Sequence, residues 1–250
     1  MTEGKLYNGA ACRRLEEIDS TNEEAKRLAA AGERGPLWII ADTQTGGRGR
    51  RGRDWISPPE NLYCTLLIAP DCTPAQGGQI SFLAALAAAH MIACLTDHSP
   101  AKMKWPNDLL IGGKKVGGIL LESASAPGSS MLDWLAVGIG VNFTAHPEGT
   151  ETPATSLKAE GIVTPLGMFD CVGLLGFAWD DWFTRWKTEG FEPVREEWLK
   201  RAHGLSQPIT ARLGQETVSG TFRDIDETGA LVLEGADGST RKISAGEVFF

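Results

Sequence analysis

Four arginines and four glycines fall within ten consecutive residues, Gly46–Trp55, which read GGRGRRGRDW. Glycine lets a backbone turn through positive φ and approach a ligand closely, and the arginine guanidinium is a planar fork of donors that matches a carboxylate or a phosphate. The stretch, here called the Arg/Gly loop, therefore predicts a loop that surrounds an anion. Because similar segments also occur as disordered tails that bind nucleic acid, the rest of the chain must decide between these readings.

Four more polar or glycine-rich clusters lie in the first 145 residues. They are Ser20-Thr21-Asn22, Lys104–Asp108 (KWPND), Lys114–Gly118 (KKVGG) and Gly138–Phe143 (GIGVNF). Each has a purely structural explanation, namely a helix cap, a turn, a solvated lysine and a β-bulge. The first three also fall at the ends of predicted elements, where α/β proteins usually place ligand sites.

The residue types favour electrostatic positioning over covalent catalysis. The chain has no GxSxG motif, and its four histidines are scattered without evident partners. Gly47–Gly52 matches GxGxxG, but two prolines follow it instead of a helix, so a dinucleotide site does not fit. A set rich in Arg, Lys and Asn is suited to hold and neutralise anions.

The elements that must position these residues are readable from apolar periodicity. Ser20 and Glu23 have the spacing of a capping box, which predicts a helix from there to Ala31. The apolar run Leu37–Ala41 predicts a buried strand that leads directly into the Arg/Gly loop. A core helix is predicted at Gln76–Leu95, and further strands at Arg13–Ile18, Asn61–Ala69, Lys102–Trp105, Leu109–Ile111, Lys115–Ser123 and Leu132–Phe143.

In the second half of the chain the composition changes twice, from loop to helix and then from helix to strand. Thr144–Pro165 is predicted to be mostly loop, and two amphipathic helices are predicted at Leu166–Lys187 and Val194–His203. After Gly204 the runs Ile209–Leu213, Thr217–Ile225, Ala230–Leu233 and Arg241–Ser244 predict a small separate β-barrel. We therefore expect a catalytic domain at 1–203 and a β domain at 204–250.

Composition and charge exclude several classes of protein. With 42% hydrophobic and 22% charged residues the chain is of ordinary globular composition, and a formal net charge of −8 opposes a nucleic-acid-binding surface. Five cysteines without a CxxC pair indicate reduced thiols in the cytoplasm. No secretory signal is visible in the first twenty residues, and the longest apolar segment, Ile80–Leu95, is shorter than the roughly 18 to 20 residues that span a bilayer.

Taken in order, STN, QTGGRGRRGRDW, KWPND, KKVGGILLE and GIGVNF resemble the biotin protein ligase family, the biotin–[acetyl-CoA-carboxylase] ligases, over Leu15–Phe143. The resemblance implies an α/β (α+β) fold: a mixed β-sheet flanked by helices, like the catalytic domain of class II aminoacyl-tRNA synthetases and biotin/lipoate ligases, with a small C-terminal SH3-like barrel. It implies an enzyme that joins biotin to ATP as biotinyl-5'-AMP, releases pyrophosphate and passes biotin to a lysine of a biotin carboxyl carrier domain. Some members carry an N-terminal DNA-binding domain that represses biotin genes, and the sequence resembles the form without it.

Site residues follow from the resemblance, position by position. It implies that Lys115, Arg50 and Arg48 are catalytic. Biotin contacts are implied for Ser20, Thr21, Asn22, Gln44, Arg48, Gly49, Arg50 and Lys115. Nucleotide contacts are implied for Arg50, Arg53, Trp55, Lys104, Asn107, Asp108 and Asn142. Mg²⁺ is expected to arrive with ATP near Asp108, without a permanently bound metal.

The expected partner is the carrier domain of a biotin-dependent carboxylase, with no DNA and no membrane. The resemblance allows a homodimer, and it leaves the residue that contacts adenine unassigned. Three alternatives stay open: a lipoate protein ligase, which shares the fold and the adenylation chemistry; a non-catalytic biotin-binding protein; and a nucleic-acid-binding module that uses the Arg/Gly loop.

Overall fold

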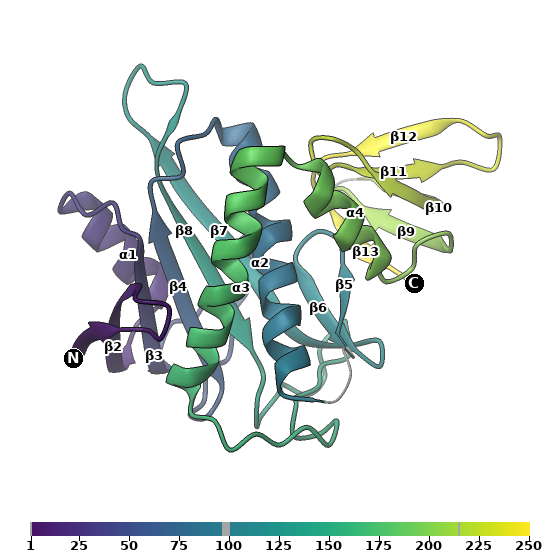
Figure 1. Ribbon diagram of the computed structural model, residues 1–250. Helices are drawn as coiled ribbons and strands as arrows, with labels where there is room; N and C mark the ends of the chain where they lie inside the picture. Colours follow the sequence, from purple (N-terminus) through teal and green to yellow (C-terminus); the bar gives the residue numbers. More distant parts are fainter. Residues whose placement is uncertain (1, 97–100, 215) are drawn as a thin grey trace.

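The computed structural model describes residues 2–96, 101–214 and 216–250, which form two β-sheets and four α-helices (Figure 1). The large sheet has the strand order β1-β2-β3-β4-β8-β7-β6-β5. Its strands are β1 Thr2–Lys5, β2 Ala11–Ile18, β3 Leu37–Gln44, β4 Leu62–Ile68, β5 Lys102–Lys104, β6 Asp108–Ile111, β7 Lys114–Ser125 and β8 Leu132–Val141. Only the β2–β3 pair of this sheet is parallel, so the mixed sheet expected from the sequence is confirmed.

Helices cover both faces of this sheet. They are α1 Thr21–Ala30, α2 Pro74–Cys94, α3 Met168–Glu189 and α4 Glu192–Lys200. Side chains on a strand alternate between faces, and β3 shows this directly. Trp38 and Ile40 join the core formed with α2 and α3, while Ile39 packs with Ala25 and Ala29 of α1 on the other face. Figure 1 shows α2 and α3 side by side on one face.

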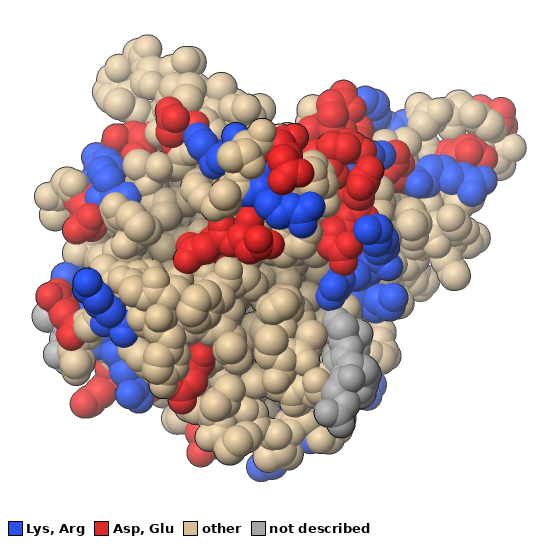
Figure 2. All heavy atoms as spheres, viewed as in Figure 1, with Lys and Arg blue, Asp and Glu red and all other residues tan. Residues whose placement is uncertain are grey.

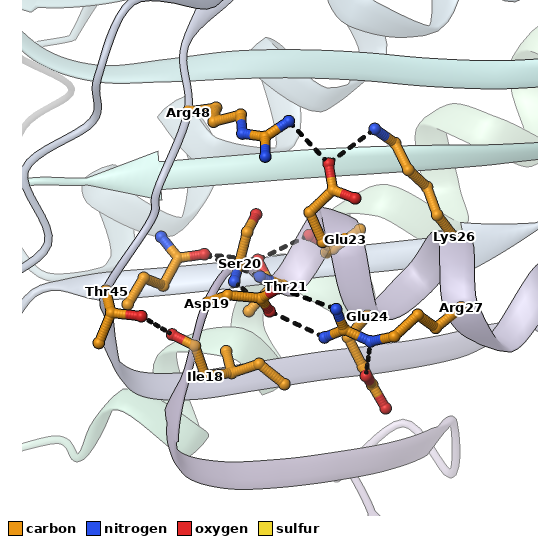
Figure 3. Close-up of polar contacts among 12 residues, drawn as sticks. Ile18, Asp19, Ser20, Thr21, Glu23, Glu24, Lys26, Arg27, Thr45 and Arg48 are labelled. Atoms are coloured by element: carbon orange, nitrogen blue, oxygen red, sulfur yellow. Dashed lines mark hydrogen bonds and ion pairs between the residues drawn. The ribbon is translucent and has the colours of Figure 1, made fainter.

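The N-terminus of α1 differs from the prediction. Ser20 is the N-cap residue, but its side chain makes no capping hydrogen bond. Glu23 does not reach back to Ser20, because its carboxylate is bound to Lys26 and Arg48 instead (Figure 3). The predicted capping box is therefore wrong, although the helix lies where it was expected.

A capping box is present on α2, where the sequence reading did not place one. Thr73 Oγ1 accepts from the Gln76 N–H, and Gln76 Oε1 accepts from the Thr73 N–H. The helix consequently begins at Pro74 and reaches 21 residues, so by length and composition it could cross a membrane, which corrects the shorter segment inferred above. Its most apolar window is 78% buried inside the protein, which is typical of a core helix.

The last five strands form a separate antiparallel sheet with the order β12-β11-β10-β9-β13. They are β9 Pro208–Arg212, β10 Thr217–Ile225, β11 Leu231–Glu234, β12 Thr240–Ile243 and β13 Glu247–Phe249. The predicted β unit is confirmed as an SH3-like sheet, but the end strands β12 and β13 do not pair within the described residues, so the predicted barrel is not closed. The short strands β1 and β13 were not predicted.

The segment between β8 and α3 contains no helix or strand of its own, as the sequence indicated. It nevertheless lies against the large sheet at one point. The backbone of Lys115 donates to Pro153 O at 2.7 Å and accepts from the Thr155 N–H at 2.8 Å, which makes an isolated parallel bridge to Ala154. This contact holds residues 150–154 at the end of the sheet where β7 begins.

Candidate functional site

A cavity of about 410 Å³ lies at the end of the large sheet where β3 and β8 end and β4 begins. This volume falls within the range of small-molecule sites. Every site residue predicted from the sequence contributes to its lining: Ser20, Thr21, Asn22, Gln44, Arg48, Gly49, Arg50, Arg53, Trp55, Lys104, Asn107, Asp108, Lys115 and Asn142. The structure thus brings the clusters together, and the individual roles remain predictions.

Neutral donors and acceptors occupy the end of the cavity formed by α1 and β3. Gln44 Oε1 accepts from the Thr21 N–H at 2.8 Å, while Gln44 Nε2 donates to Ser57 Oγ at 3.0 Å. The buried hydroxyl of Thr65 lies 2.6 Å from Asn22 Oδ1. These bonds fix the orientation of the two amides, so this end is prepared for a polar but uncharged group.

A chain of polar contacts runs from Asn22 to the Arg/Gly loop. Asn22 Nδ2 donates to Glu122 at 2.9 Å, and Glu122 pairs with Lys26 at 2.5 Å. Lys26 also pairs with Glu23 at 2.9 Å, and Glu23 binds Arg48 Nη1 at 3.0 Å (Figure 3). The position of Arg48 is therefore tied to the first turns of α1.

The Arg/Gly loop folds back on itself. Gly49 N–H donates to Arg53 O at 2.6 Å, and Trp55 N–H donates to Gly47 O at 2.9 Å. Gly52 has φ +72°, a conformation that favours glycine, and it closes a short 3₁₀ turn. This turn directs three of the four arginine side chains toward the cavity.

The loop arginines have partners of different charge. Arg53 forms an ion pair with Glu247 of β13, and Arg51 lies 4.0 Å from the same carboxylate. Arg50 instead donates to the neutral side-chain oxygen of Asn107 at 3.2 Å, and burial lowers the pKa of its guanidinium. Of the loop arginines, Arg50 would contribute most to the free energy of binding an anion in the cavity. No carboxylate has to be displaced from its guanidinium first.

Lys115 and Trp55 lie against the glycine-bearing strands. Lys115 Nζ pairs with Asp108 at 2.6 Å and lies 5.4 Å from the centre of the Trp55 ring. A Cβ atom on Gly140 of β8 would lie only 2.8 Å from that indole. The glycine clears space for the ring, and the register of β8 is regular there, so a β-bulge does not explain it. Trp55 Nε1 is buried without a hydrogen-bond partner among the described residues.

Lys104 lies at the opposite end of the cavity, where the two sheets meet. Its side chain donates to Thr152 Oγ1 at 3.2 Å and lies 5.5 Å from the centre of the Phe249 ring. Burial lowers the pKa of this amine. Asn142, also predicted for this region, lines the cavity but uses its side-chain amide to donate to Thr155 O at 3.0 Å.

Several lining residues were missed, above all Glu247 and Phe249 of β13 and the segment 150–152. The positive charge of four arginines in one loop indicates that a carboxylate lies nearby to neutralise part of it. The sequence does not identify that carboxylate. The Arg212 guanidinium lies 4.4 Å from the centre of the Phe249 ring and pairs with Glu151 at 2.7 Å. This places the C-terminal sheet at the rim of the cavity.

Comparison with protein families gives two matches. Residues 15–142 match the biotin/lipoate A/B protein ligase family, and residues 204–250 match the biotin protein ligase C-terminal domain. A curated relative, the biotin–[acetyl-CoA-carboxylase] ligase of Paracoccus denitrificans, is 43% identical over 249 residues, which cover 94% of this chain and 99% of the relative.

Solved structures agree with this assignment. A biotin protein ligase from Aquifex aeolicus, in complex with biotin and ATP, superposes with a TM-score of 0.80 at 26% identity and covers 95% of this chain and 97% of its own. The Leishmania major biotin protein ligase in complex with biotinyl-5-AMP gives a TM-score of 0.64 at 25% identity, with 94% and 98% coverage. The chain therefore belongs to the biotin protein ligases of the biotin/lipoate A/B protein ligase family.

Proposed function

We propose that this enzyme activates biotin with ATP and then transfers it to a lysine of a biotin carboxyl carrier domain. One observation carries the proposal. The cations Lys115, Arg48, Arg50 and Arg53 line the same cavity as the neutral, oriented amides of Asn22 and Gln44. A cavity with one uncharged polar end and one cationic region suits a ligand with a neutral headgroup and an anionic reacting end.

The first step brings two anions together. A biotin carboxylate oxygen attacks the α-phosphorus of ATP, a C–O–P anhydride forms, and the bond from the α-phosphorus to the bridging oxygen of pyrophosphate breaks. Charge moves from the carboxylate to the leaving pyrophosphate. The protein must therefore neutralise charge and align the reactants, and it needs no protein nucleophile.

We assign the biotin headgroup to Ser20, Thr21, Asn22 and Gln44, since these residues form the neutral end of the cavity. In this proposal Arg48, Gly49 and Arg50 surround the carboxylate and the α-phosphate. Lys115 exchanges its bond to Asp108 for the biotin carboxylate and the α-phosphate oxygens, and so stabilises the charge that develops between them.

The nucleotide is assigned to the region where the sheets meet. Its contacts would be Arg50, Arg53, Trp55, Lys104, Asn107, Asp108 and Asn142. Mg²⁺ would enter as part of the substrate, with Asp108 as a single carboxylate ligand, since Mg²⁺ in nucleotide sites is held mainly by phosphates, waters and one or two carboxylates. Asp108 lines the cavity beside Lys115, so its carboxylate would be available to an ion that the phosphates carry.

In the second step the carrier lysine amine attacks the acyl carbon of biotinyl-AMP. An amide C–N bond forms, the bond from that carbon to the phosphate oxygen breaks, and the amine loses a proton as AMP leaves. Lys115 and Arg50 remain beside the phosphate that departs. The carrier domain would belong to a biotin-dependent carboxylase, and we place the reaction in the cytoplasm without DNA or membrane, by an enzyme able to form a homodimer.

The alternative functions, nucleic-acid binding and lipoate ligation, have less support than biotin ligation. The net charge of −8 opposes binding to a nucleic acid, and the face in Figure 2 shows acidic and basic side chains side by side around α4 instead of a basic surface. The loop arginines are in part committed to carboxylates of the protein itself, Glu23 and Glu247. Lipoate remains the main competitor for the cavity, since the matched family includes ligases for both acids.

The decisive assay combines the purified protein with Mg-ATP, an apo carrier domain and either biotin or lipoate. We expect ATP-dependent modification of one carrier lysine with biotin, detected by mass spectrometry, and thermal stabilisation by biotin but not by lipoate. Modification by lipoate alone would change the substrate assignment. Stabilisation by biotin without any modification would indicate a non-catalytic biotin-binding protein.

A further inference from the structure

Trp105, the second residue of the KWPND segment, binds the C-terminal sheet. Its side chain is 2% exposed, and its Nε1–H donates to the carbonyl oxygen of Gly229 at 3.0 Å in a buried contact. Gly229 lies in the turn between β10 and β11, more than 120 residues away in the chain. Leaving a buried indole N–H unpaired costs free energy, so this bond favours one position of the turn.

The turn between β10 and β11 packs closely against α2 and has a fixed shape. Gly229 has φ +85°, and a Cβ atom there would lie 2.7 Å from the ring of Phe82 on α2. Asp226 Oδ1 accepts from the Thr228 N–H at 2.9 Å and the Ala230 N–H at 3.0 Å, which fixes the shape of the turn. A second bond, from Gln79 Nε2 to Glu227 O at 2.9 Å, attaches the same turn to α2.

Trp105 itself and its neighbours in the chain line the cavity, whereas Gly229 does not, so Gly229→Ala tests the contact without changing the lining. Lys104 precedes Trp105 and lies beside the Phe249 ring, while Asn107 follows it and accepts from Arg50. The C-terminal sheet returns Glu247 and Phe249 of β13 to the same region of the cavity lining. Figure 1 shows the C-terminal sheet on the same side of the large sheet as β5 and β6. One short segment thus both anchors the C-terminal sheet and presents polar groups to the cavity.

We propose that Trp105 is a positioning residue that seats the C-terminal sheet over the nucleotide end of the cavity, and that through this contact it sets the affinity for ATP but not for biotin. The inference rests on the proposed function. The biotin end is built from α1, β3 and β4, and its hydrogen bonds involve Thr21, Asn22, Gln44 and Thr65 but no residue of the C-terminal sheet.

Two substitutions test this in the full-length protein. Trp105→Phe removes the N–H donor and keeps an aromatic ring, while Gly229→Ala forces the turn away from Phe82. For both we expect the KM for ATP to rise about tenfold, the effect of losing about one buried hydrogen bond, with the KM for biotin changed less than about twofold. Biotin-dependent pyrophosphate exchange measures both constants, and thermal unfolding identifies the folded variants.

Matched controls separate positioning from general weakening. Tyr7→Phe also keeps an aromatic ring and removes one long-range side-chain hydrogen bond, from Tyr7 Oη–H to Asp170 Oδ1 at 2.7 Å, away from the cavity lining and the turn. Gly238→Ala imposes the same backbone strain at φ +78° with no heavy atom within 4 Å of the added Cβ. Both should keep the wild-type KM for ATP.

The results distinguish failure of this inference from failure of the proposed function. A parallel rise of both KM values, an unchanged KM for ATP in the folded Trp105→Phe and Gly229→Ala proteins, or equal effects in the controls would overturn the inference and leave the proposed function intact. If Trp105→Phe fails to fold, Gly229→Ala carries the same test. Wild-type protein that shows no biotin-dependent exchange would overturn the proposed function itself, and the inference with it.

Discussion

The cations of the site are held by acceptors of the protein itself. Lys115 pairs with Asp108 and Arg48 pairs with Glu23, whereas Arg50 binds the neutral Asn107. In the proposed mechanism each ion pair holds a side chain beside the cavity and is exchanged for a contact with substrate. Preorganised charge of this kind acts in the transition state without a large reorganisation of the protein.

Lys115 allows a direct test at this scale. Lys115→Gln should lower the rate of biotin-dependent pyrophosphate exchange by about 10²- to 10³-fold, since one preorganised cation is lost at the point where charge moves. The fold should be retained, because the side chain is partly exposed and lies at the cavity. Lys114→Gln is the control, since its exposed amine pairs with Glu160 away from the cavity. Equal activity of the two variants would contradict the role given to Lys115.

The residues that line the cavity were largely predictable from the sequence, and their partners within the protein were not. The Arg/Gly loop, KWPND and KKVGG supply ligand-binding chemistry within short stretches, so their composition alone indicates a site. Glu247 and Glu23 are ordinary acidic residues in a chain with 32 of them. Only the fold brings Glu247 from β13 to Arg53, and no local pattern records that contact.

At the scale of elements, the Arg/Gly loop packs against β8 at a glycine, Gly140, whose lack of a side chain leaves room for the loop. A strand glycine normally weakens a sheet, so its presence marks a close approach. Here Gly140 accommodates the Trp55 indole. The ring in turn lies beside Lys115 and forms part of the cavity wall.

We predict that Gly140→Ala displaces Trp55 and lowers adenylation about tenfold or more, because overpacking of this kind costs about 1–3 kcal/mol when the neighbour must move. The measurement is pyrophosphate exchange, together with quenching of tryptophan fluorescence as the indole becomes exposed. Gly4→Ala is the control, because it is also a strand glycine but has only Cys12 Sγ, at 3.8 Å, near the added Cβ. Wild-type exchange by Gly140→Ala would show that the clearance is not needed.

Element boundaries show where local signals fail. The core helix and the central strands were predicted from their apolar runs and the two later helices from their amphipathic spacing, and the structure confirms these elements. The capping box at Ser20 failed because a Glu at the right spacing has other uses, here the pair with Arg48. Strand β1 was missed since all four of its residues are exposed, so burial leaves no apolar pattern in it.

At the scale of the whole molecule, the mixed sheet with helices and the additional C-terminal β unit were predictable, and so was the biotin ligase family. The way in which the units meet was not. That contact depends on single long-range bonds such as Trp105 to Gly229. We retain as a proposal the division into a catalytic unit, 1–203, and a C-terminal unit, 204–250, joined at this turn.

The turn between β10 and β11, where the two units meet, contains a carboxyl whose ionisation is expected to stabilise the fold. The Asp226 side chain is 7% exposed and lies 2.8 Å from Lys242 Nζ. Burial acts to raise the pKa of this carboxyl, but the bonds from Lys242, Thr228 and Ala230 outweigh it and lower the pKa from 3.8 to about 2. A carboxyl with a lower pKa in the folded state stabilises the fold above its unfolded pKa, and this contribution is lost as the pH falls.

The expected contribution is about 2 kcal/mol at neutral pH, and it should disappear between about pH 5 and pH 2. We therefore predict that Asp226→Asn is less stable than wild type at pH 7, and that the difference shrinks steadily as the pH falls through this range. Urea unfolding at a series of pH values, followed by tryptophan fluorescence, measures it. Asp237→Asn, which alters an exposed turn carboxylate of the same sheet bonded to Ser239, should show a smaller difference from wild type throughout. A stability difference for Asp226→Asn that stays constant from pH 7 to pH 2 would show that this carboxylate does not make the turn acid-sensitive.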